Sequence, residues 1–235
     1  MAMSASNLAG AGDSANLASY ATASITPTAN ALVLIAVENQ LSGTPTIPTV
    51  TGCGLTWVQI STCLFDNTFT QARITVFRTL GASPTTGTLT IDFGGVAQSC
   101  AGWTVDQFTG VDTTGTDGSG AIVQSAKTAE PAAAATTSVT ATLGSAITSG
   151  NAAWTAASWE ASETGTAEAG WTALGEGTHA SPPDTVKSSW RNASDDNSAT
   201  TSWTTSALAG AIIVEIKDGA AAPVLAPRMM TSLYR

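Results

Sequence analysis

Apolar and polar residues alternate along two neighbouring segments of the chain, residues 55–62 and 71–80. Leu55, Trp57 and Phe77 stand among apolar positions that are separated by Thr, Gln or Arg. A period of two residues is typical of a strand with one buried and one wet face. β-Branched and aromatic side chains also suit a pleated surface better than a helix. These segments therefore predict a hairpin, around which we expect the rest of the chain to be organised.

Turn residues separate further strand patterns on both sides of this hairpin. The continuous apolar run at residues 31–37 is short and rich in β-branched side chains, which predicts a strand buried on both faces. Helix has little support, because the helix-friendly residues 132–135 follow Pro131 and precede a Thr/Ser run. The expected strands cover residues 17–25, 31–37, 55–62, 71–80, 88–93, 96–108, 122–127, 137–143, 151–159, 170–175, 185–191, 200–205 and 209–216.

The second half of the chain repeats the strand order of the first half in this interpretation. Residues 151–159, 170–175, 185–191, 200–205 and 209–216 correspond to residues 31–37, 54–59, 73–79, 88–93 and 100–108. Such an order suits a jelly roll, a sandwich of two sheets to which each half contributes strands. The alternative is that the two halves are not a true repeat, because any all-β chain with turns every 8–12 residues shows a similar correspondence between its halves.

We therefore expect an all-β protein, a two-sheet antiparallel β-sandwich of jelly-roll type, with a single domain at residues 16–218. Residues 1–15 are rich in Gly, Ala and Ser and predict a flexible N-terminal arm. Residues 219–235 lose the alternation and predict an extended C-terminal arm that binds a neighbouring subunit, the alternative being a disordered end. The partner-binding candidates in this arm are Val224, Leu225, Met229, Met230, Leu233 and Tyr234.

Composition narrows the classes of partner. Only 11% of the residues are charged while 43% are hydrophobic, which is typical of proteins packed among neighbours or exposed outside cells. The net charge of −9 argues against a nucleic-acid partner, because eight Lys and Arg residues cannot neutralise a run of phosphates. No apolar run approaches the length of a membrane span. The first residues lack the basic start and apolar core of a secretory signal, so synthesis in the cytoplasm is expected.

Few residues offer catalytic or metal-binding chemistry. The odd number of cysteines, three, indicates buried thiols, although oxidation of Cys63 with Cys100 stays open. The only histidine, His179, is expected on a surface loop, and no Gly-x-Ser-x-Gly elbow accompanies it. Asp112 and Asp117 are weak calcium candidates in a turn-rich segment without the terminal Glu of an EF-hand. We expect no cofactor.

The carboxylates leave a glycan hydrolase open as an alternative function, and the tryptophans leave a sugar-binding surface open. Asp92 with Asp106, or Glu160 with Glu163, could serve as the two carboxylates of a glycan hydrolase if the fold brought them together. Two of the seven tryptophans, Trp190 and Trp203, stand beside polar residues and are candidates for a surface that stacks sugar rings. Trp57 and Trp103 stand in predicted core strands, so packing is their expected role.

The succession of strand patterns at residues 22–28, 54–58, 74–78, 103–112 and 214–217 resembles a loosely defined group of jelly-roll proteins from tailed bacteriophages and related viral metagenomes. The resemblance covers residues 17–217 and includes no catalytic motif. It implies a non-enzymatic virion component that decorates the capsid, with the major capsid protein or other virion proteins as partners and a homo-oligomeric state. The alternative that it implies is a tail adhesion module. The group defines no functional residue, so Trp190 and Trp203 are candidates for binding a host surface glycan only because of their polar neighbours.

Overall fold

The computed structural model describes residues 2–68 and 70–219, which form sixteen strands and one short 3₁₀ turn at Ser119–Ala121. The first eight strands are β1 (Ser4–Asp13), β2 (Ser19–Ala21), β3 (Leu32–Ser42), β4 (Thr49–Gly52), β5 (Val58–Asp66), β6 (Thr70–Leu80), β7 (Leu89–Asp92) and β8 (Cys100–Thr109). The second eight are β9 (Ile122–Lys127), β10 (Thr136–Thr142), β11 (Ala152–Trp159), β12 (Thr166–Ala167), β13 (Thr172–Ala180), β14 (Pro183–Arg191), β15 (Ser198–Ala207) and β16 (Ala209–Ile216).

The two sets of eight strands have the same topology. The first large sheet has the order β1-β8-β3-β6-β5, and the second large sheet has the order β9-β16-β11-β14-β13. The first small sheet is β2-β7-β4, and the second small sheet is β10-β15-β12. Adding eight to each strand number converts one order into the other, so β1–β8 and β9–β16 are two copies of one arrangement, here called the first half and the second half. The predicted repeat is confirmed for all five pairs of segments.

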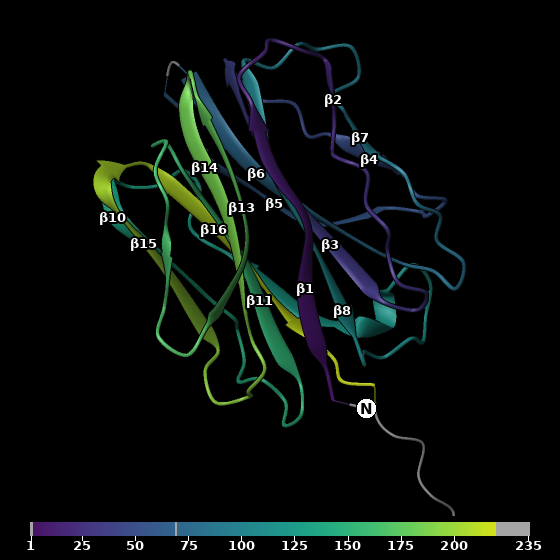
Figure 1. Cartoon of the computed structure of the whole chain (residues 1–235). Coiled ribbons are helices and arrows are strands. Elements are labelled where there is room, and N and C mark those ends of the chain that lie inside the picture. The colour runs from purple at the N-terminus through teal and green to yellow at the C-terminus, as the bar shows by residue number, and fades with distance from the viewer. Residues whose placement is uncertain (1, 69, 220–235) are drawn as a thin grey trace, which may run out of the picture.

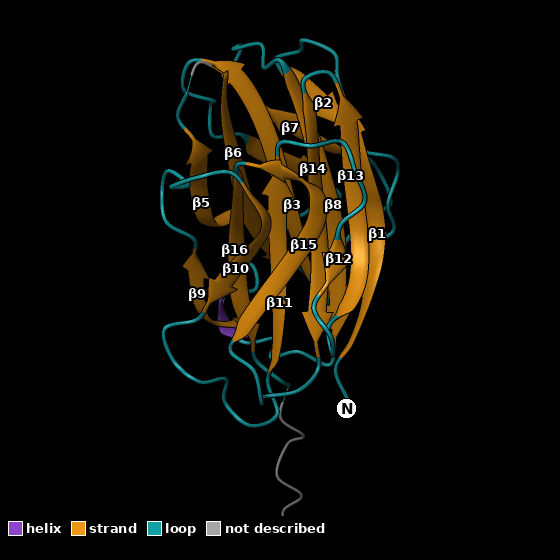
Figure 2. Cartoon of the chain, turned by 90° about the vertical axis from the view of Figure 1, so that its left-hand side faces the viewer, coloured by secondary structure: helices purple, strands orange, loops and turns teal. Residues whose placement is uncertain are grey.

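The four sheets are stacked as layers, with the two large sheets in the middle (Figure 1). Each small sheet covers the outer face of the large sheet of its own half. Figure 2 views the second small sheet from outside, with β15 and β12 in front of the second large sheet. Because every pair between named strands is antiparallel, the prediction of an all-β antiparallel sandwich is confirmed.

Strand β3 shows how one strand supplies two cores. Leu32, Leu34 and Ala36 lie in the core between the two large sheets, whereas the alternate residues Val33 and Ile35 lie in the core under the first small sheet. Successive side chains of a strand point to opposite faces, so the continuous apolar run is buried on both sides as predicted. Its counterpart in the second half, strand β11, repeats the arrangement.

Two features of the predicted architecture are wrong. The halves were expected to share the two sheets of one sandwich, but each sheet contains strands of one half only. The N-terminal arm expected at residues 1–15 is instead mostly strand β1, which pairs with β8 at the edge of the first large sheet. Gly, Ala and Ser have low strand propensity, so local sequence did not identify a strand that tertiary contacts stabilise.

Glycines explain why β1 has this composition. A Cβ atom on Gly12 of β1 would lie 2.5 Å from the carbonyl oxygen of Thr178 in β13, and one on Gly10 would lie 2.6 Å from that of Glu176. On the opposite side, a Cβ atom on Gly177 would lie 2.2 Å from the carbonyl oxygen of Ala11. Backbones can approach this closely only where side chains are absent. The two large sheets therefore meet backbone to backbone along the edge that β1 and β13 form.

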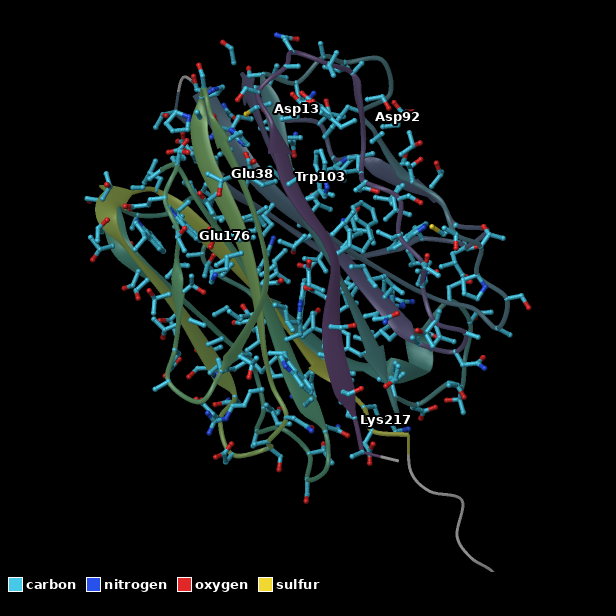
Figure 3. All side chains as sticks on the ribbon, viewed as in Figure 1. Asp13, Glu38, Asp92, Trp103, Glu176 and Lys217 are labelled. Atoms are coloured by element: carbon cyan, nitrogen blue, oxygen red, sulfur yellow. The ribbon has the colours of Figure 1, made fainter. Side chains whose placement is uncertain are left out.

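The described chain ends at Gly219, whose amide donates to the carbonyl oxygen of Gly110. The six partner-binding candidates of the expected C-terminal arm, Val224 to Tyr234, lie outside the described residues. Residue Lys217 lies at the lower end of the molecule, near the N-terminus, whereas Asp13 at the end of β1 lies at the upper end (Figure 3).

Close approach of the two backbones predicts a strong effect of one methyl group. Gly177→Ala should lower the free energy of unfolding by about 1–3 kcal/mol or more, because the new Cβ overlaps carbonyl oxygens of both Ala11 and Trp103. Urea unfolding followed by tryptophan fluorescence measures the change. Gly144→Ala is the matched control, because a Cβ atom there meets nothing within 4 Å. Equal stability of the two variants would contradict the tight edge.

Candidate functional site

A polar cluster interrupts the apolar core between the two large sheets. Glu38 of β3 and Cys100 of β8 come from the first half, and His179 of β13 comes from the second half. All three are at most 4% exposed. His179 Nε2 lies 2.8 Å from Glu38 Oε2, and a ligand atom of each of the three side chains lies within 4.8 Å of the others. Glu38 is labelled in the upper part of the view in Figure 3.

Strand alternation and one glycine place this cluster. Glu38 is on the face of β3 that also carries Leu34 and Ala36, so it points toward the second large sheet. Its partner across the strand pair is Gly102 of β8, where a Cβ atom would lie 3.4 Å from Glu38 Oε2 and 3.3 Å from Val186 Cγ1. The absence of a side chain at Gly102 leaves room for the carboxyl group between the sheets.

Asp184 of β14 extends the cluster. Its Oδ1 atom accepts a hydrogen bond from Ser158 Oγ at 2.7 Å, and its Oδ2 atom accepts one from Gln40 Nε2 at 2.8 Å. Complete burial raises the pKa of Asp184 and of Glu38 well above their ordinary values. The charge of Glu38 raises the pKa of Asp184 further, whereas a hydrogen bond with Asp184 lowers the pKa of Glu38. Burial, with the nearby carboxyl groups of Asp66 and Asp184, raises the pKa of Glu160 to about 8.

The position of His179 corrects the sequence interpretation. It was expected on a surface loop, but it is 4% exposed on strand β13. Its Nδ1 atom lies 2.6 Å from the carbonyl oxygen of Pro182, and its Nε2 atom faces Glu38. No sequence motif could identify this cluster, because its members are separated by most of the chain and only the packing of the two halves joins them.

Another buried carboxyl group connects the halves in the same interface. Asp106 of β8 accepts hydrogen bonds from Asn7 Nδ2 and from Trp154 Nε1 of the second half, both at 2.9 Å. Burial raises the pKa of Asp106 to about 6 despite these hydrogen bonds and a further one with Ser188. Asp106 is completely buried and Asp92 is exposed on the first small sheet, so the two do not form an accessible carboxylate pair.

The tryptophan candidates for glycan binding are not exposed platforms. Trp203 is 7% exposed and stacks on Trp159 with ring centroids 4.9 Å apart and an interplanar angle of 5°. Trp190 is partly buried and packs edge-to-face on Phe108 at 6.0 Å. The expectation that these two side chains form a surface is therefore wrong, since amphipathic side chains of the second half pack inward here.

The calcium candidates are not gathered into a site. Asp112 Oδ2 lies 2.6 Å from Lys217 Nζ, which together with the hydrogen bonds from Thr114 lowers the pKa of Asp112 to about 2. A lysine ammonium thus occupies the place of a cation. Within residues 2–68 and 70–219, the one group of three or more metal-ligating side chains is Glu38, Cys100 and His179, which does not include Asp112 or Asp117. All three cysteines are free and buried, so the thiol prediction is confirmed.

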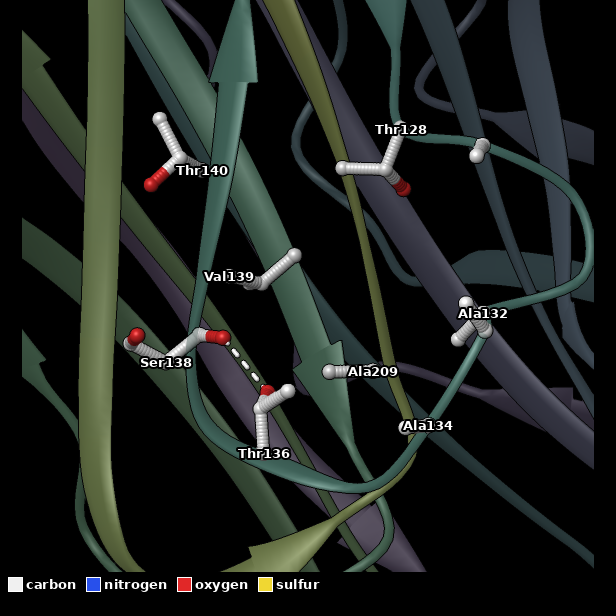
Figure 4. Close-up of a pocket in the computed structure, with 10 residues that line it drawn as sticks. Thr128, Ala132, Ala134, Thr136, Ser138, Val139, Thr140 and Ala209 are labelled. Carbon is white, nitrogen blue, oxygen red and sulfur yellow. Dashed lines mark hydrogen bonds between the residues drawn. The ribbon is translucent and has the colours of Figure 1, made fainter.

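Two surface hollows lie away from the buried cluster of Glu38, Cys100 and His179. One, of about 290 Å³, lies between the loop that follows β9, strand β10 and the start of β16 (Figure 4). Its lining consists of Ala, Thr, Ser and Val side chains without a titratable group. The other, of about 400 Å³, is lined by residues 111–114 and Gly219. The second hollow includes one carboxyl group, that of Asp112, which pairs with Lys217.

Three loops of the first half converge on the buried side chain of Gln98. Its Oε1 atom accepts from the amide of Thr46, its Nε2 atom donates to the carbonyl oxygen of Val96, and its backbone amide donates to the carbonyl oxygen of Leu17. Three exposed large apolar side chains of the described chain stand in these loops, Leu17 (42%), Ile47 (41%) and Val96 (45%). We call this group the apolar loop end.

No protein-family model, no curated protein sequence and no solved structure matches this chain. In the part of the chain that the structure describes, no helix has the length and apolar character needed to cross a membrane. Any function must therefore be inferred from the arrangement of the residues themselves.

The buried Asp106 predicts a pH dependence of stability. Its pKa rises from an ordinary value of 3.8 to about 6 on folding, so the folded state holds a proton that the unfolded state releases between about pH 4 and pH 6. The free energy of unfolding should consequently fall as the pH rises through this range, by at most about 3 kcal/mol from this group. Above about pH 6 Asp106 is ionised in both the folded and the unfolded state, so its contribution to the free energy of unfolding no longer changes with pH.

Comparison with Asp106→Asn isolates this contribution. Urea unfolding of both proteins from pH 4 to pH 7 should show the variant gaining stability relative to the unmodified chain as the pH rises. Asp92→Asn, at an exposed carboxyl group, controls for the removal of a charge. Parallel profiles for the Asp106→Asn variant and the unmodified chain would contradict the assignment.

Proposed function

We propose that this chain is a non-enzymatic structural protein of a bacteriophage virion, an auxiliary protein that decorates the assembled capsid shell. The observation that carries the proposal is the strand pairing of each half. In the first half β1 pairs with β8, β2 with β7 and β3 with β6, and the second half repeats the same nested pairs. Nested pairs of this kind result when one long hairpin is rolled into two sheets, the arrangement of a jelly roll.

The repeat supports a refined version of the expected fold. Each half supplies eight strands, the number of one jelly roll, so the chain is proposed to contain two jelly rolls packed through their large sheets. Jelly rolls are recurrent building units of viral capsids. Fold alone does not define function, but the sparse charge and the composition of the surface also favour a protein that works by contact.

The apolar loop end is the proposed contact with the shell. Leu17, Ile47 and Val96 are each more than 40% exposed, and the hydrogen bonds of Gln98 hold their three loops together. Burial of such side chains against a partner is favourable because apolar surface leaves water. Lys217, close to the end of the described chain, lies at the opposite end of the molecule (Figure 3).

Location on virus particles tests the proposal directly. Antibody raised against the recombinant protein should label the heads of purified particles from the source host in immunogold electron microscopy, and mass spectrometry should find the chain in those particles. Gold confined to the tail end would favour an adhesion protein instead. Particles without label, and without the chain by mass spectrometry, would overturn the virion assignment.

Substitution of the apolar loop end tests the contact surface. The triple variant Leu17→Ser, Ile47→Ser, Val96→Ser should lose at least about tenfold in affinity for shells that lack the protein, since each buried aliphatic side chain contributes about 1.5 kcal/mol or more. Co-sedimentation with the shells measures binding, and circular dichroism checks folding. Val123→Ser is the matched control, because Val123 is 46% exposed on β9 of the other half. Unchanged binding by the triple variant would exclude this surface.

A further inference from the structure

We propose that Glu38, Cys100 and His179 form a binding site for a divalent transition-metal ion of the zinc class, held between the two halves of the chain. The three side chains supply a carboxylate oxygen, a sulfur and an imidazole nitrogen, all within 4.8 Å of one another. These are the ligand types that zinc binds in proteins. The mixture of sulfur and nitrogen with a single carboxylate also disfavours calcium and magnesium, which select oxygen ligands.

The orientation of His179 suits a ligand. Its Nδ1 atom lies 2.6 Å from the carbonyl oxygen of Pro182, which accepts a hydrogen bond from the Nδ1–H group and leaves the Nε2 lone pair directed at Glu38. Histidines that bind metals commonly donate their other ring N–H to a backbone carbonyl in this way. The turn between β13 and β14 therefore fixes both the tautomer and the direction of the ring.

Glu38 and Gly102 provide two further observations. Glu38 Oε1 is completely buried, yet it has no hydrogen-bond partner among residues 2–68 and 70–219. Buried carboxylate oxygens without a partner are costly, so this atom is available as a second oxygen ligand. Directly opposite, Gly102 carries no side chain, which allows the Glu38 carboxyl group to lie between the sheets beside His179.

The charges of the three ligands match a divalent cation. A carboxylate and a thiolate carry two negative charges and neutral imidazole carries none, so the occupied site is neutral in the interior. Binding displaces the Cys100 thiol proton and the proton that lies between Glu38 and His179, and both leave to solvent. Among the ion pairs of the described chain, only that of His179 with Glu38 belongs to this cluster. Asp184 beside it adds a further acidic group.

The site would act as a clamp between the halves. Glu38 and Cys100 belong to the first large sheet, whereas His179 belongs to the second large sheet. A metal ion bound to all three connects the two sheets across their interface, and its binding free energy is added to that of folding. Because the site is closed to solvent, the ion enters while the halves assemble.

Refolding with cobalt tests the site. Urea-unfolded protein should be refolded with and without CoCl₂ under reducing conditions, and excess metal removed by gel filtration. We expect about one Co²⁺ per chain by elemental analysis, with a thiolate-to-cobalt charge-transfer band and the visible bands of tetrahedral cobalt. Zn²⁺ added during a parallel refolding should prevent the cobalt spectrum and raise the unfolding temperature relative to metal-free protein.

Variants assign the ligands. Cys100→Ser and His179→Gln should abolish the charge-transfer band and lower bound cobalt at least about tenfold. Cys63→Ser, at a thiol that is also completely buried between the large sheets, should retain both. Refolded unmodified protein that takes up neither Co²⁺ nor Zn²⁺ would overturn the proposal and leave Glu38 and His179 as a hydrogen-bonded pair. That measurement decides the question even if a variant does not fold.

Discussion

The contact between the two large sheets is the interaction on which the rest of the structure depends. Its core combines apolar side chains of β3 and β6 from the first half with those of β11 and β16 from the second half. Each small sheet then needs only to cover the remaining face of its own large sheet. Because burial of apolar surface is the main favourable term in folding, neither half would hide its inner face without the other. Glycines of β1 and β13 allow the closest approach at one edge of this contact.

The repeat places corresponding residues of the two halves in the same interface. Glu38 pairs with Gly102 in β3 and β8, and Ser158 pairs with Gly210 in β11 and β16, at the same step of each strand pair. Ser158 donates to Asp184, whose carboxyl group influences the ionisation of Glu38. One position of the repeated unit therefore carries an acid in one half and a hydroxyl in the other, and the two meet in one polar network. Such a network fixes how the sheets are positioned, because buried polar groups tolerate few arrangements.

The proposed contact surface for the shell and the proposed metal site lie in separate parts of this molecule. The apolar loop end lies in exposed loops of the first half, whereas Glu38, Cys100 and His179 are enclosed between the large sheets. A protein that binds a shell must keep its exposed surface in a fixed geometry, since a flexible surface loses conformational entropy when it binds. A metal clamp between the halves would contribute to that rigidity without taking part in the contact itself.

Local sequence determined most of the strands and the repeated order of the two halves. Alternation and β-branched runs are properties of neighbouring residues, so segments such as 122–127 and 209–216 were predicted with the bounds that the structure has. Only the tertiary structure decided that β1 is a strand, that each half forms its own two sheets, and that His179 and Trp203 are buried. These features depend on contacts between residues that lie far apart in the chain. The periodicity of a single segment carries no information about such contacts.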